Sequence, residues 1–385
     1  MPVFARRKLA TTATAVMLAA GALVVLQPDA SAWAGTPQGA NWWTGTYPGA
    51  DWQRADAAAE GFDPAKLAEI ASAAQADGSN CMVVIRHGRL VGEWYWNGTN
   101  ADSAQEVFSV TKSVTSTLVG IAQSRWKLNV DDKAAKYIPA WAGTPASQVT
   151  VKNLLGNNSG RHWDAVTDYV TLPTADDRTA LGASLPQDHR PGDVWAYNNA
   201  AIQTLDDVLS KSTGVEPADY ADKNLFAPIG MRDTRLTRDP SGNTNMFFGM
   251  QSTCEDLARF GHLFLKDGRW NLRQIVSSRW VHEATGKPSQ PITSSYGYLW
   301  WLNHLGAVAN ALVPMTREDS ANAPRERMVS NAPADMYWAI GLGGQVVQVD
   351  PGSDTVVVRL GPMNLSNKKW PATSARVVTE ALVDR

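Results

Sequence analysis

The chain has 385 residues, of which 44% are hydrophobic and 19% charged, and its formal net charge is -2. A chain this rich in apolar residues is not disordered, and a charge so close to zero gives no basic surface for nucleic acid. The length is enough for one large domain or two ordinary ones. Tryptophan is abundant, with 16 residues. That excess indicates an aromatic core, an apolar cleft or a sugar-binding surface.

The first 32 residues have the pattern of a secretory signal peptide. The basic run Arg6-Arg7-Lys8 precedes an apolar run over 15–26, and Ala30-Ser31-Ala32 is a small-residue cleavage site. The basic run also partly matches a twin-arginine signal, so the export route is Sec or twin-arginine. No apolar run is long enough to span a membrane. We therefore expect a mature protein that is secreted or extracytoplasmic and has no membrane anchor.

The next predicted elements are an arm, a helix and a hairpin. Residues 33–55 are rich in Gly, Pro and Trp and predict an extended N-terminal arm. Asp63-Pro64 marks the start of a helix whose apolar face includes Leu67, Ile70 and Ala74. Strand-like runs at 81–85 and 90–96 flank His87-Gly88-Arg89, which predicts an antiparallel hairpin.

The C-terminal end repeats this theme. Runs at 338–350 and 355–360 flank Pro351-Gly352-Ser353-Asp354 and predict a second hairpin, and Pro371 begins a final helix. Helical periodicity dominates the residues between the two ends. The pattern predicts a discontinuous α/β domain, a helical domain inserted in it, and a small-molecule site in the cleft between them. The boundaries are 56–112 and 246–385 for the α/β domain and 113–245 for the helical domain.

The two cysteines and six histidines carry less information. Cys81 and Cys254 either form a disulfide, as an oxidising compartment permits, or remain two buried thiols. The histidines are scattered and none has the spacing of a metal site. We expect no metal and no other cofactor.

The candidate nucleophile is a serine, because the sequence motifs of other nucleophiles and of cofactor sites are missing. In an S-x-x-K motif a lysine one helical turn after a serine removes its proton. Three copies occur, at Ser109–Lys112, Ser124–Lys127 and Ser366–Lys369. Only the first begins a long run of small and apolar residues, which predicts a buried helix. The other two lie in polar segments typical of a solvated surface.

Burial and the positive end of the helix dipole both disfavour the charged form of Lys112, so this lysine suits a base near neutral pH. The Ser109 N–H, at the helix N-terminus, suits a developing oxyanion. The alternative is structural: a capping serine beside a lysine that reaches solvent.

At this point the sequence resembles a known family. Residues 108–113, Phe-Ser-Val-Thr-Lys-Ser, resemble the nucleophile box of the serine hydrolases related to class C β-lactamases, D,D-peptidases, family VIII-type esterases and 6-aminohexanoate-oligomer hydrolases. Tyr197-Asn198-Asn199 resembles their second box, Y-x-N. Tyr95-Trp96-Asn97 has the same letters but lies on a predicted strand before the nucleophile, so we reject it. With similar segments at 149–160 and 296–301, the resemblance spans roughly 56–383.

The resemblance implies an α+β fold of the β-lactamase/D,D-peptidase type: an antiparallel sheet flanked by helices, an inserted all-helical domain, and the active site in the cleft between them. It implies that Tyr197 shares a proton network with Ser109 and Lys112, and that it helps to activate the nucleophile and to protonate the leaving group. It also implies that Asn199 contacts Lys112 or a substrate amide. A buried, hydrogen-bonded tyrosine and an asparagine in a turn are the structural alternatives.

The third box departs from the family pattern. Lactamases and peptidases have Lys or His, then Thr or Ser, then Gly, whereas the matching strand has Ala339-Ile340-Gly341. Gly341 lets substrate approach the strand, and the resemblance makes the N–H of Leu342 the second oxyanion donor, beside that of Ser109. A substrate carboxylate loses a charged contact commonly worth about 1.5 to 3 kcal/mol. We therefore expect an ester or linear amide, in a small molecule or short oligomer.

Tryptophans lie beside the boxes: Trp163, Trp195, Trp300-Trp301 and Trp338. Core packing is the default for each of them, but their clustering beside the boxes favours the walls of an apolar cleft, with Trp163 and Trp195 contacting the substrate. Two other functions stay open: a D,D-carboxypeptidase or β-lactamase, and a secreted non-catalytic binder of cell wall or polysaccharide. The binder would use Trp42, Trp43 and Trp52 as a stacking surface. The oligomeric state is open.

Overall fold

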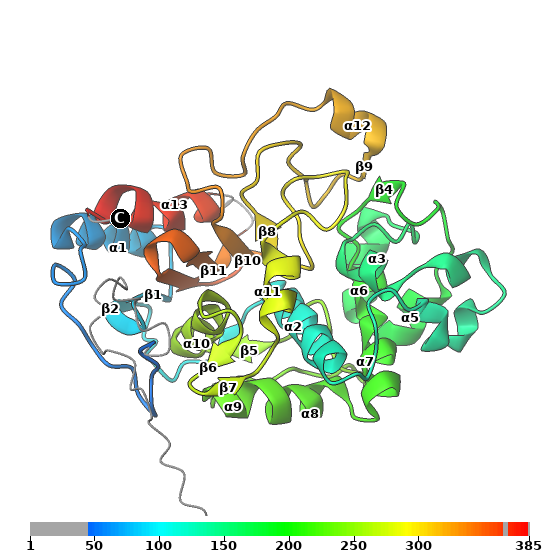
Figure 1. Cartoon of the computed structure of the whole chain (residues 1–385), viewed down its shortest axis with the longest axis horizontal. Coiled ribbons are helices and arrows are strands. Elements are labelled where there is room, and N and C mark those ends of the chain that lie inside the picture. The colour runs from blue at the N-terminus through cyan, green and yellow to red at the C-terminus, as the bar shows by residue number, and fades with distance from the viewer. Residues whose placement is uncertain (1–44, 365–368, 384–385) are drawn as a thin grey trace, which may run out of the picture. The chain divides into compact units, whose positions relative to one another are not determined.

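The computed structural model describes residues 45–364 and 369–383 (Figure 1). The predicted signal peptide, most of the arm and Ser366 lie outside these residues. By its contacts, the chain from Gly45 onward forms one compact unit. Among the described residues, no helix has both the length and the apolar composition needed to cross a membrane.

The two ends of the chain combine in one antiparallel sheet of six strands, in the order β2-β1-β12-β11-β10-β8. Cys81 in β1 lies opposite Leu360 in β12, and Arg86 lies opposite Thr355. Both predicted hairpins, β1–β2 and β11–β12, are confirmed. Every position of β1, β11 and β12 is buried, as expected of strands covered on both faces. The strands are β1 (Cys81–Arg86), β2 (Arg89–Tyr95), β8 (Trp301–Leu302), β10 (Tyr337–Gly341), β11 (Gln345–Asp350) and β12 (Thr355–Leu360).

The single strand predicted over 338–350 is wrong, because a tight turn divides it into β10 and β11. Gly343 and Gly344 have φ of 79° and 86°. Glycine adopts this left-handed region without a steric penalty, so two consecutive glycines reverse the chain between the strands. The turn places Leu342 at the end of β10, at the surface.

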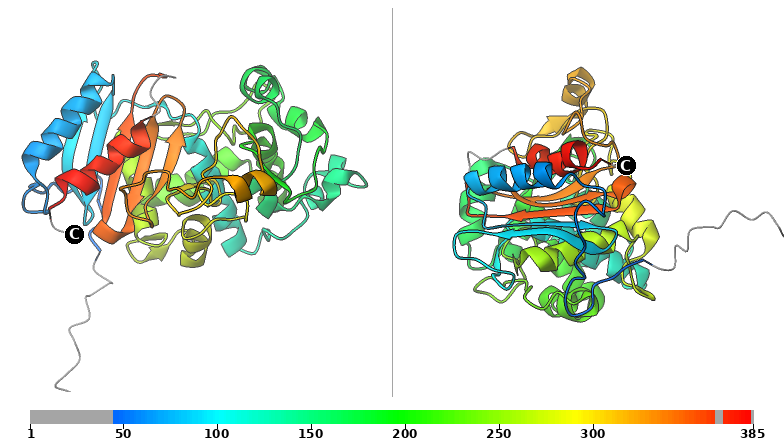
Figure 2. Two further views of the ribbon diagram at one scale, coloured as in Figure 1. Left: turned by 90° about the horizontal axis from the view of Figure 1, so that it is seen from above. Right: turned by 90° about the vertical axis from the view of Figure 1, so that its left-hand side faces the viewer.

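Helices cover both faces of the sheet. α1 (Pro64–Ala76) and α13 (Trp370–Arg376), continued by η7 (Val377–Ala381), lie side by side on one face (Figure 2). The Asp63 carboxylate caps α1 by accepting from two backbone N–H groups, which confirms the predicted start of the helix. α10 (Cys254–Leu265) packs on the opposite face. It packs so closely that a Cβ at Gly261 would lie 2.6 Å from Val356.

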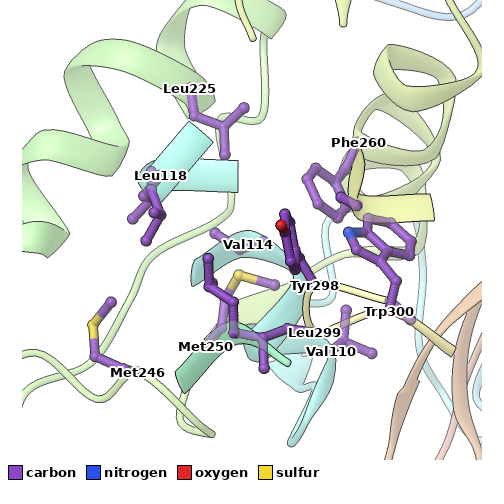
Figure 3. Packing of buried hydrophobic residues seen from close by; sticks show 14 of the residues in the cluster. Val110, Val114, Leu118, Leu225, Met246, Met250, Phe260, Tyr298, Leu299 and Trp300 are labelled. Carbon is purple, nitrogen blue, oxygen red and sulfur yellow. The ribbon is translucent and has the colours of Figure 1, made fainter. Parts of the chain in front are cut away.

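α2 (Val110–Ser124) is the buried helix that the sequence predicts, and it contacts both the sheet and the helical region. Its apolar residues Val110, Val114 and Leu118 belong to the same buried cluster as Tyr298 and Trp300 (Figure 3). The predicted boundary between residues 112 and 113 therefore falls inside one continuous helix. α2 places Ser109, at its N-terminus, where the two regions meet.

The region between α2 and the second half of the sheet consists largely of short helices. Two short strand pairs connect it to the rest: β3 (Gln105–Glu106) with β5 (Gln251–Ser252), and β4 (Val194–Trp195) with β9 (Met315–Thr316). Its main helices are α3 (Val151–Leu155), α5 (Arg178–Ser184), α6 (Asn199–Gln203), α7 (Leu205–Thr213), α8 (Pro217–Ala221) and α9 (Ala227–Ile229).

The remaining elements lie around these layers. They include the π-helical turns η4 (Thr167–Thr171) and η5 (Asp222–Phe226), the hairpin β6 (Arg269–Trp270) with β7 (Arg273–Gln274), and the helices α4 (Leu172–Thr174), α11 (Ser278–Thr285) and α12 (Arg317–Asn322). Within residues 45–364 and 369–383 there are also the 3-10 turns η1 (Ala134–Lys136), η2 (Pro139–Trp141), η3 (Pro145–Gln148) and η6 (Pro351–Ser353).

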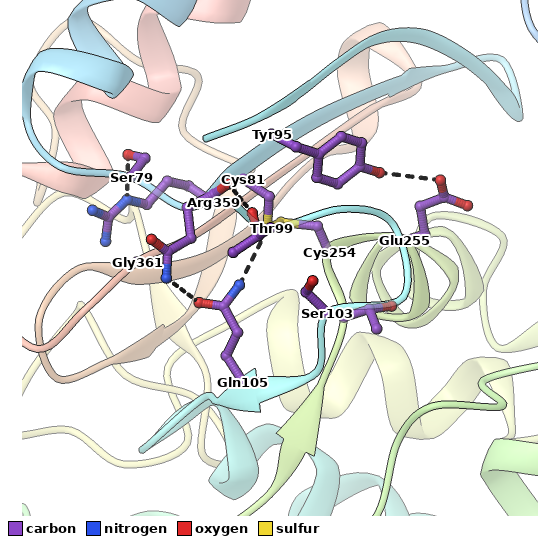
Figure 4. The surroundings of a disulfide bond; sticks show 12 residues. Ser79, Cys81, Tyr95, Thr99, Ser103, Gln105, Cys254, Glu255, Arg359 and Gly361 are labelled. Carbon is purple, nitrogen blue, oxygen red and sulfur yellow. Dashed lines mark hydrogen bonds between the residues drawn. A yellow bond between two sulfur atoms is a disulfide. The ribbon is translucent and has the colours of Figure 1, made fainter. Parts of the chain in front are cut away.

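The two cysteines form a disulfide, which decides between the two states that the sequence left open. The Cys81–Cys254 bond joins β1 to the first residue of α10, with the Cα atoms 6.4 Å apart (Figure 4). The Gln105 side chain lies against it, with Nε2 at 3.7 Å from the sulfur of Cys81. The bond therefore lies next to β3, the strand that leads into the nucleophile segment.

Candidate active site

The structure brings together the predicted serine and lysine at the start of α2. Ser109 is partly exposed, whereas Lys112 is 1% exposed. Lys112 Nζ is 2.7 Å from Ser109 Oγ and donates to the carbonyl of Phe247 at 2.9 Å. Phe108 has φ of 47°, a left-handed conformation that a bulky residue rarely adopts. The backbone therefore bends sharply just before Ser109.

The environment of Lys112 changes its ionisation. Burial lowers its pKa to about 7, and the Asp168 carboxylate opposes this effect. Near neutral pH a large fraction of Lys112 is therefore an amine rather than an ammonium. An amine at hydrogen-bond distance from a hydroxyl is able to accept its proton.

Tyr197 lies beside this pair. It is 6% exposed, Lys112 Nζ lies 4.7 Å from its ring centroid, and its hydroxyl lies close enough to Ser109 for that side chain to influence its ionisation. Burial raises the pKa of Tyr197 above its ordinary value of 10, and the interaction with Ser109 opposes this shift without cancelling it. Tyr197 therefore stays a phenol at neutral pH. This protonation state suits a proton donor better than a base.

Aromatic rings fix the position of Tyr197. Trp301 stacks on it with a centroid distance of 5.6 Å, and Tyr296 meets it edge-on at 6.0 Å. The Trp163 indole N–H donates to the Tyr197 carbonyl at 3.0 Å. Trp163 and Trp301 are both partly exposed, so each keeps some surface at the site.

Trp195 does not lie where the sequence suggested. It is 0% exposed and packs edge-on against Tyr296 at a centroid distance of 5.5 Å. Trp300 and Trp338 are also 0% exposed. A side chain with no exposed surface meets no substrate, so these three tryptophans belong to the core and do not form cleft walls.

The predicted site residue Asn199 is paired with Asp168, a residue that sequence reasoning missed. The Asn199 side chain donates to the Asp168 backbone carbonyl at 3.5 Å, and no hydrogen bond from it to Lys112 is found among the described residues. The Asp168 carboxylate accepts from the N–H groups of Asn199 and Ala200 at 2.8 and 3.0 Å. Burial raises the pKa of Asp168 to about 6, and these two bonds oppose the shift. Asp168 belongs to no motif, so only its position after folding shows that it holds the turn following Tyr197.

β10 lies directly against the nucleophile segment. A Cβ at Gly341 would be 2.2 Å from the Val107 carbonyl oxygen, so the missing side chain permits this close approach. Leu342 follows and is 43% exposed. Among the described residues, neither the Ser109 N–H nor the Leu342 N–H donates a hydrogen bond. Both are therefore free to bind a ligand oxygen.

A second carboxylate missed from the sequence ties the site together. Glu106 accepts from the Phe108 N–H at 3.0 Å, the Gly249 N–H at 2.8 Å and the Gln251 side chain at 2.8 Å. It thus joins the bend before Ser109 to the segment whose Phe247 carbonyl holds Lys112. The only sequence signal is its place three residues before the nucleophile.

A partly exposed serine and a buried lysine on a helix between an antiparallel sheet and a helical region are features of β-lactamase-like proteins. The chain matches the Beta-lactamase family over residues 65–381 and belongs to that family, whose members are serine hydrolases.

Individual relatives are distant. The chain is 23% identical to a 6-aminohexanoate-dimer hydrolase of Paenarthrobacter ureafaciens over 317 residues, which are 77% of this chain and 74% of the relative. It is 26% identical over 147 residues to the D-alanyl-D-alanine-carboxypeptidase/endopeptidase AmpH of Escherichia coli (strain K12), covering 36% and 38% of the two chains. A class C β-lactamase in complex with cefoxitin superposes with a TM-score of 0.61 at 16% identity, covering 82% of this chain and 97% of that one. The structural likeness confirms the predicted α+β fold.

Proposed function

We propose that the protein hydrolyses a carboxylic ester or a linear amide through an acyl-enzyme on Ser109. The observation that carries the proposal is the 2.7 Å contact between Ser109 Oγ and Lys112 Nζ, a lysine whose pKa burial lowers to about 7. A serine hydroxyl is a weak nucleophile until a nearby base takes its proton. Lys112 supplies that base at neutral pH.

The proposed reaction has two steps. Neutral Lys112 takes the Ser109 proton while Oγ attacks the substrate carbonyl, and the N–H groups of Ser109 and Leu342 bind the oxyanion. The Tyr197 phenol gives its proton to the leaving alcohol or amine and regains one from the Lys112 ammonium. Water then attacks the acyl-enzyme, and the carboxylic acid leaves while Ser109 regains its proton.

The strand beside the nucleophile supports a substrate without a carboxylate at this position. Ala339 is 1% exposed and Ile340 is partly buried, so β10 presents neither a cation nor a hydroxyl where lactamases and peptidases have both. The name of the Paenarthrobacter relative, a 6-aminohexanoate-dimer hydrolase, also favours a linear amide. A β-lactam or D-Ala-D-Ala peptide, the alternative favoured by the match to AmpH, lacks the charged contact for its carboxylate.

Hydrolysis of four substrate classes tests this preference. We expect an activated p-nitrophenyl ester and aminohexanoate dimer to be cleaved with kcat/KM at least about tenfold above that for a cephalosporin or a D-Ala-D-Ala peptide, because a lost charged hydrogen bond of 1.5 to 3 kcal/mol corresponds to a factor of roughly 10 to 150. Initial rates at fixed enzyme concentration give the comparison. Preferred turnover of the cephalosporin or the peptide would instead establish the lactamase or peptidase alternative.

The structure offers little for the non-catalytic binder. Trp52 is 6% exposed and packs between His262 and Arg259, so it is not part of an exposed stacking surface. Trp42 and Trp43 lie outside the described residues. Substrate turnover is thus the better-supported role.

We also propose that the protein is exported. The Cys81–Cys254 disulfide supports export, because such bonds persist in oxidising compartments and are rare in the cytosol. The predicted cleavage after Ala32 is expected to give a mature chain that begins at Trp33. Intact mass and N-terminal sequencing of protein from the culture medium or periplasm measure this. An intracellular product that retains residues 1–32 would contradict it.

A further inference from the structure

Buried side chains hold every carbonyl oxygen of the turn between β10 and β11. Gln345 Nε2 donates to the Leu342 carbonyl at 3.1 Å. Arg359 Nη1 donates to the carbonyls of Gly343 at 2.9 Å and Gly344 at 3.1 Å. The three carbonyls are thus fixed by protein donors, whereas the Leu342 N–H donates no hydrogen bond among the described residues.

Arg359 is an unusual residue to find here, because it is 0% exposed at the next-to-last position of β12. Its Nε donates to the Ser79 hydroxyl at 2.8 Å (Figure 4), and its guanidinium lies 4.6 Å from the centroid of the Trp370 ring. Burial lowers its pKa to about 10, so it is charged at neutral pH. Within the described residues its hydrogen bonds go to a hydroxyl and two backbone carbonyls rather than to a carboxylate.

Gln345 holds the turn from its own strand. Its side chain is 0% exposed, and besides the Leu342 carbonyl it binds Gly361 at both backbone groups. Nε2 donates to the Gly361 carbonyl at 2.8 Å, and Oε1 accepts from the Gly361 N–H at 2.9 Å. The Gln345 amide therefore joins Leu342 to Gly361, the residue that follows β12. A shift of β12 would move Leu342 through these hydrogen bonds.

The turn is closely packed at both of its glycines. A Cβ at Gly343 would lie 2.8 Å from Met363 Cα, and one at Gly344 would lie 2.4 Å from Trp370 Cδ1. The backbone is therefore in contact with its surroundings at the two glycines that reverse the chain. Because Gly343 directly follows Leu342, displacing the carbonyl of Gly343 or Gly344 moves Leu342 as well.

We propose that Arg359 and Gln345 are positioning residues for the oxyanion site. By binding the carbonyls of the turn, they hold the conformation that leaves the Leu342 N–H free for the substrate oxygen. An oxyanion donor is effective when it is fixed before the reaction begins, and a planar guanidinium orients two acceptors in a way that a lysine does not. The inference rests on the proposed function, because it concerns the same site.

The test compares Arg359→Lys and Gln345→Met with the wild-type protein on p-nitrophenyl acetate. Complete loss of an oxyanion donor costs about 10²- to 10³-fold in kcat. Because these variants displace the donor without removing it, we expect kcat to fall about 10- to 100-fold while KM changes less than about threefold. The affinity for phenylboronic acid, whose serine adduct resembles the tetrahedral intermediate, is expected to fall in parallel.

Arg86→Lys is the matched control. Arg86 is 6% exposed, lies in the same sheet at the end away from the turn, and donates to the backbone carbonyls of Ser353 and Glu60. This variant removes a buried guanidinium bound to carbonyls but leaves the turn intact. We expect it to lower the melting temperature, as Arg359→Lys does, and to leave kcat and boronate affinity within twofold of wild type.

Two outcomes overturn the inference. Either folded Arg359→Lys and Gln345→Met proteins keep wild-type kcat and boronate affinity, or Arg86→Lys loses both to the same extent. If Arg359→Lys does not fold, Gln345→Met decides. Failure of the proposed function is distinguished by Ser109→Ala: if that variant remains active, the acyl-enzyme itself is wrong. If Ser109→Ala is inactive and the two turn variants are unaffected, only the positioning role is wrong.

Discussion

Ser109→Ala is expected to lower kcat for an activated ester by roughly 10⁴- to 10⁶-fold, the loss typical of removing the nucleophile of a serine hydrolase. Among the described residues the Ser109 hydroxyl has one side-chain hydrogen bond, from Lys112, and it lies near Tyr197. Its removal opens no cavity in the core, because Ser109 is partly exposed. The variant is therefore expected to fold normally, and steady-state kinetics with a thermal melt measure both effects.

Ser124→Ala is the control for this variant. Ser124 belongs to a second S-x-x-K sequence, but it is exposed at the C-terminal end of α2, and its hydroxyl donates to the Ile121 carbonyl. Its loss is expected to leave activity unchanged. Labelling with a fluorophosphonate followed by peptide mapping gives an independent reading, with the label expected on Ser109 and absent from Ser124. Full activity of Ser109→Ala, or a label at another serine, would sink the assignment.

Lys112→Met is expected to lower kcat about 10²- to 10⁴-fold, the range typical for loss of a general base. Methionine has a similar length and suits a site that is 1% exposed. The folded protein lowers the pKa of Lys112 from 10.5 to about 7, so burying this lysine in its charged form costs stability at neutral pH. The variant is therefore expected to melt at the same temperature or higher while losing activity. If Lys112 had a purely structural role, its replacement would lower both the melting temperature and the activity.

The pH profile separates these roles further. Because only the neutral amine accepts a proton, wild-type kcat/KM is expected to rise with pH through about 7. The pKa of Lys112 is lower in the folded than in the unfolded state, so the unfolded state binds more protons between pH 7 and 10.5. Over that window the wild-type free energy of unfolding is expected to rise with pH.

Both rises are expected to vanish in Lys112→Met. They are expected to remain in Lys127→Met, whose lysine is exposed. Wild-type activity that is flat between pH 5 and 9 would contradict the role of Lys112 as the base.

Local sequence patterns determined the Ser109–Lys112 pair and several elements of the fold. The S-x-x-K spacing puts Ser109 and Lys112 on one helix face, whatever surrounds the helix, and the apolar residues that follow require its burial. The capping residue Asp63 and the turn residues of the two hairpins act over a few positions, so the start of α1 and both hairpins were predictable. The resemblance of the boxes to a known family added the expectation of an antiparallel sheet flanked by helices.

The tertiary structure decided what depends on residues far apart in the chain. Sequence does not tell a buried tryptophan from a cleft wall, and only packing shows that Trp195 has no exposed surface. The pKa of Tyr197 rises because desolvation outweighs its interaction with Ser109, and desolvation exists only once the chain is packed. Asp168 and Arg359 belong to no motif. Asp168 binds the backbone at the start of α6, and Arg359 binds the turn between β10 and β11. Both contacts exist because folding brings distant backbone groups within hydrogen-bond distance.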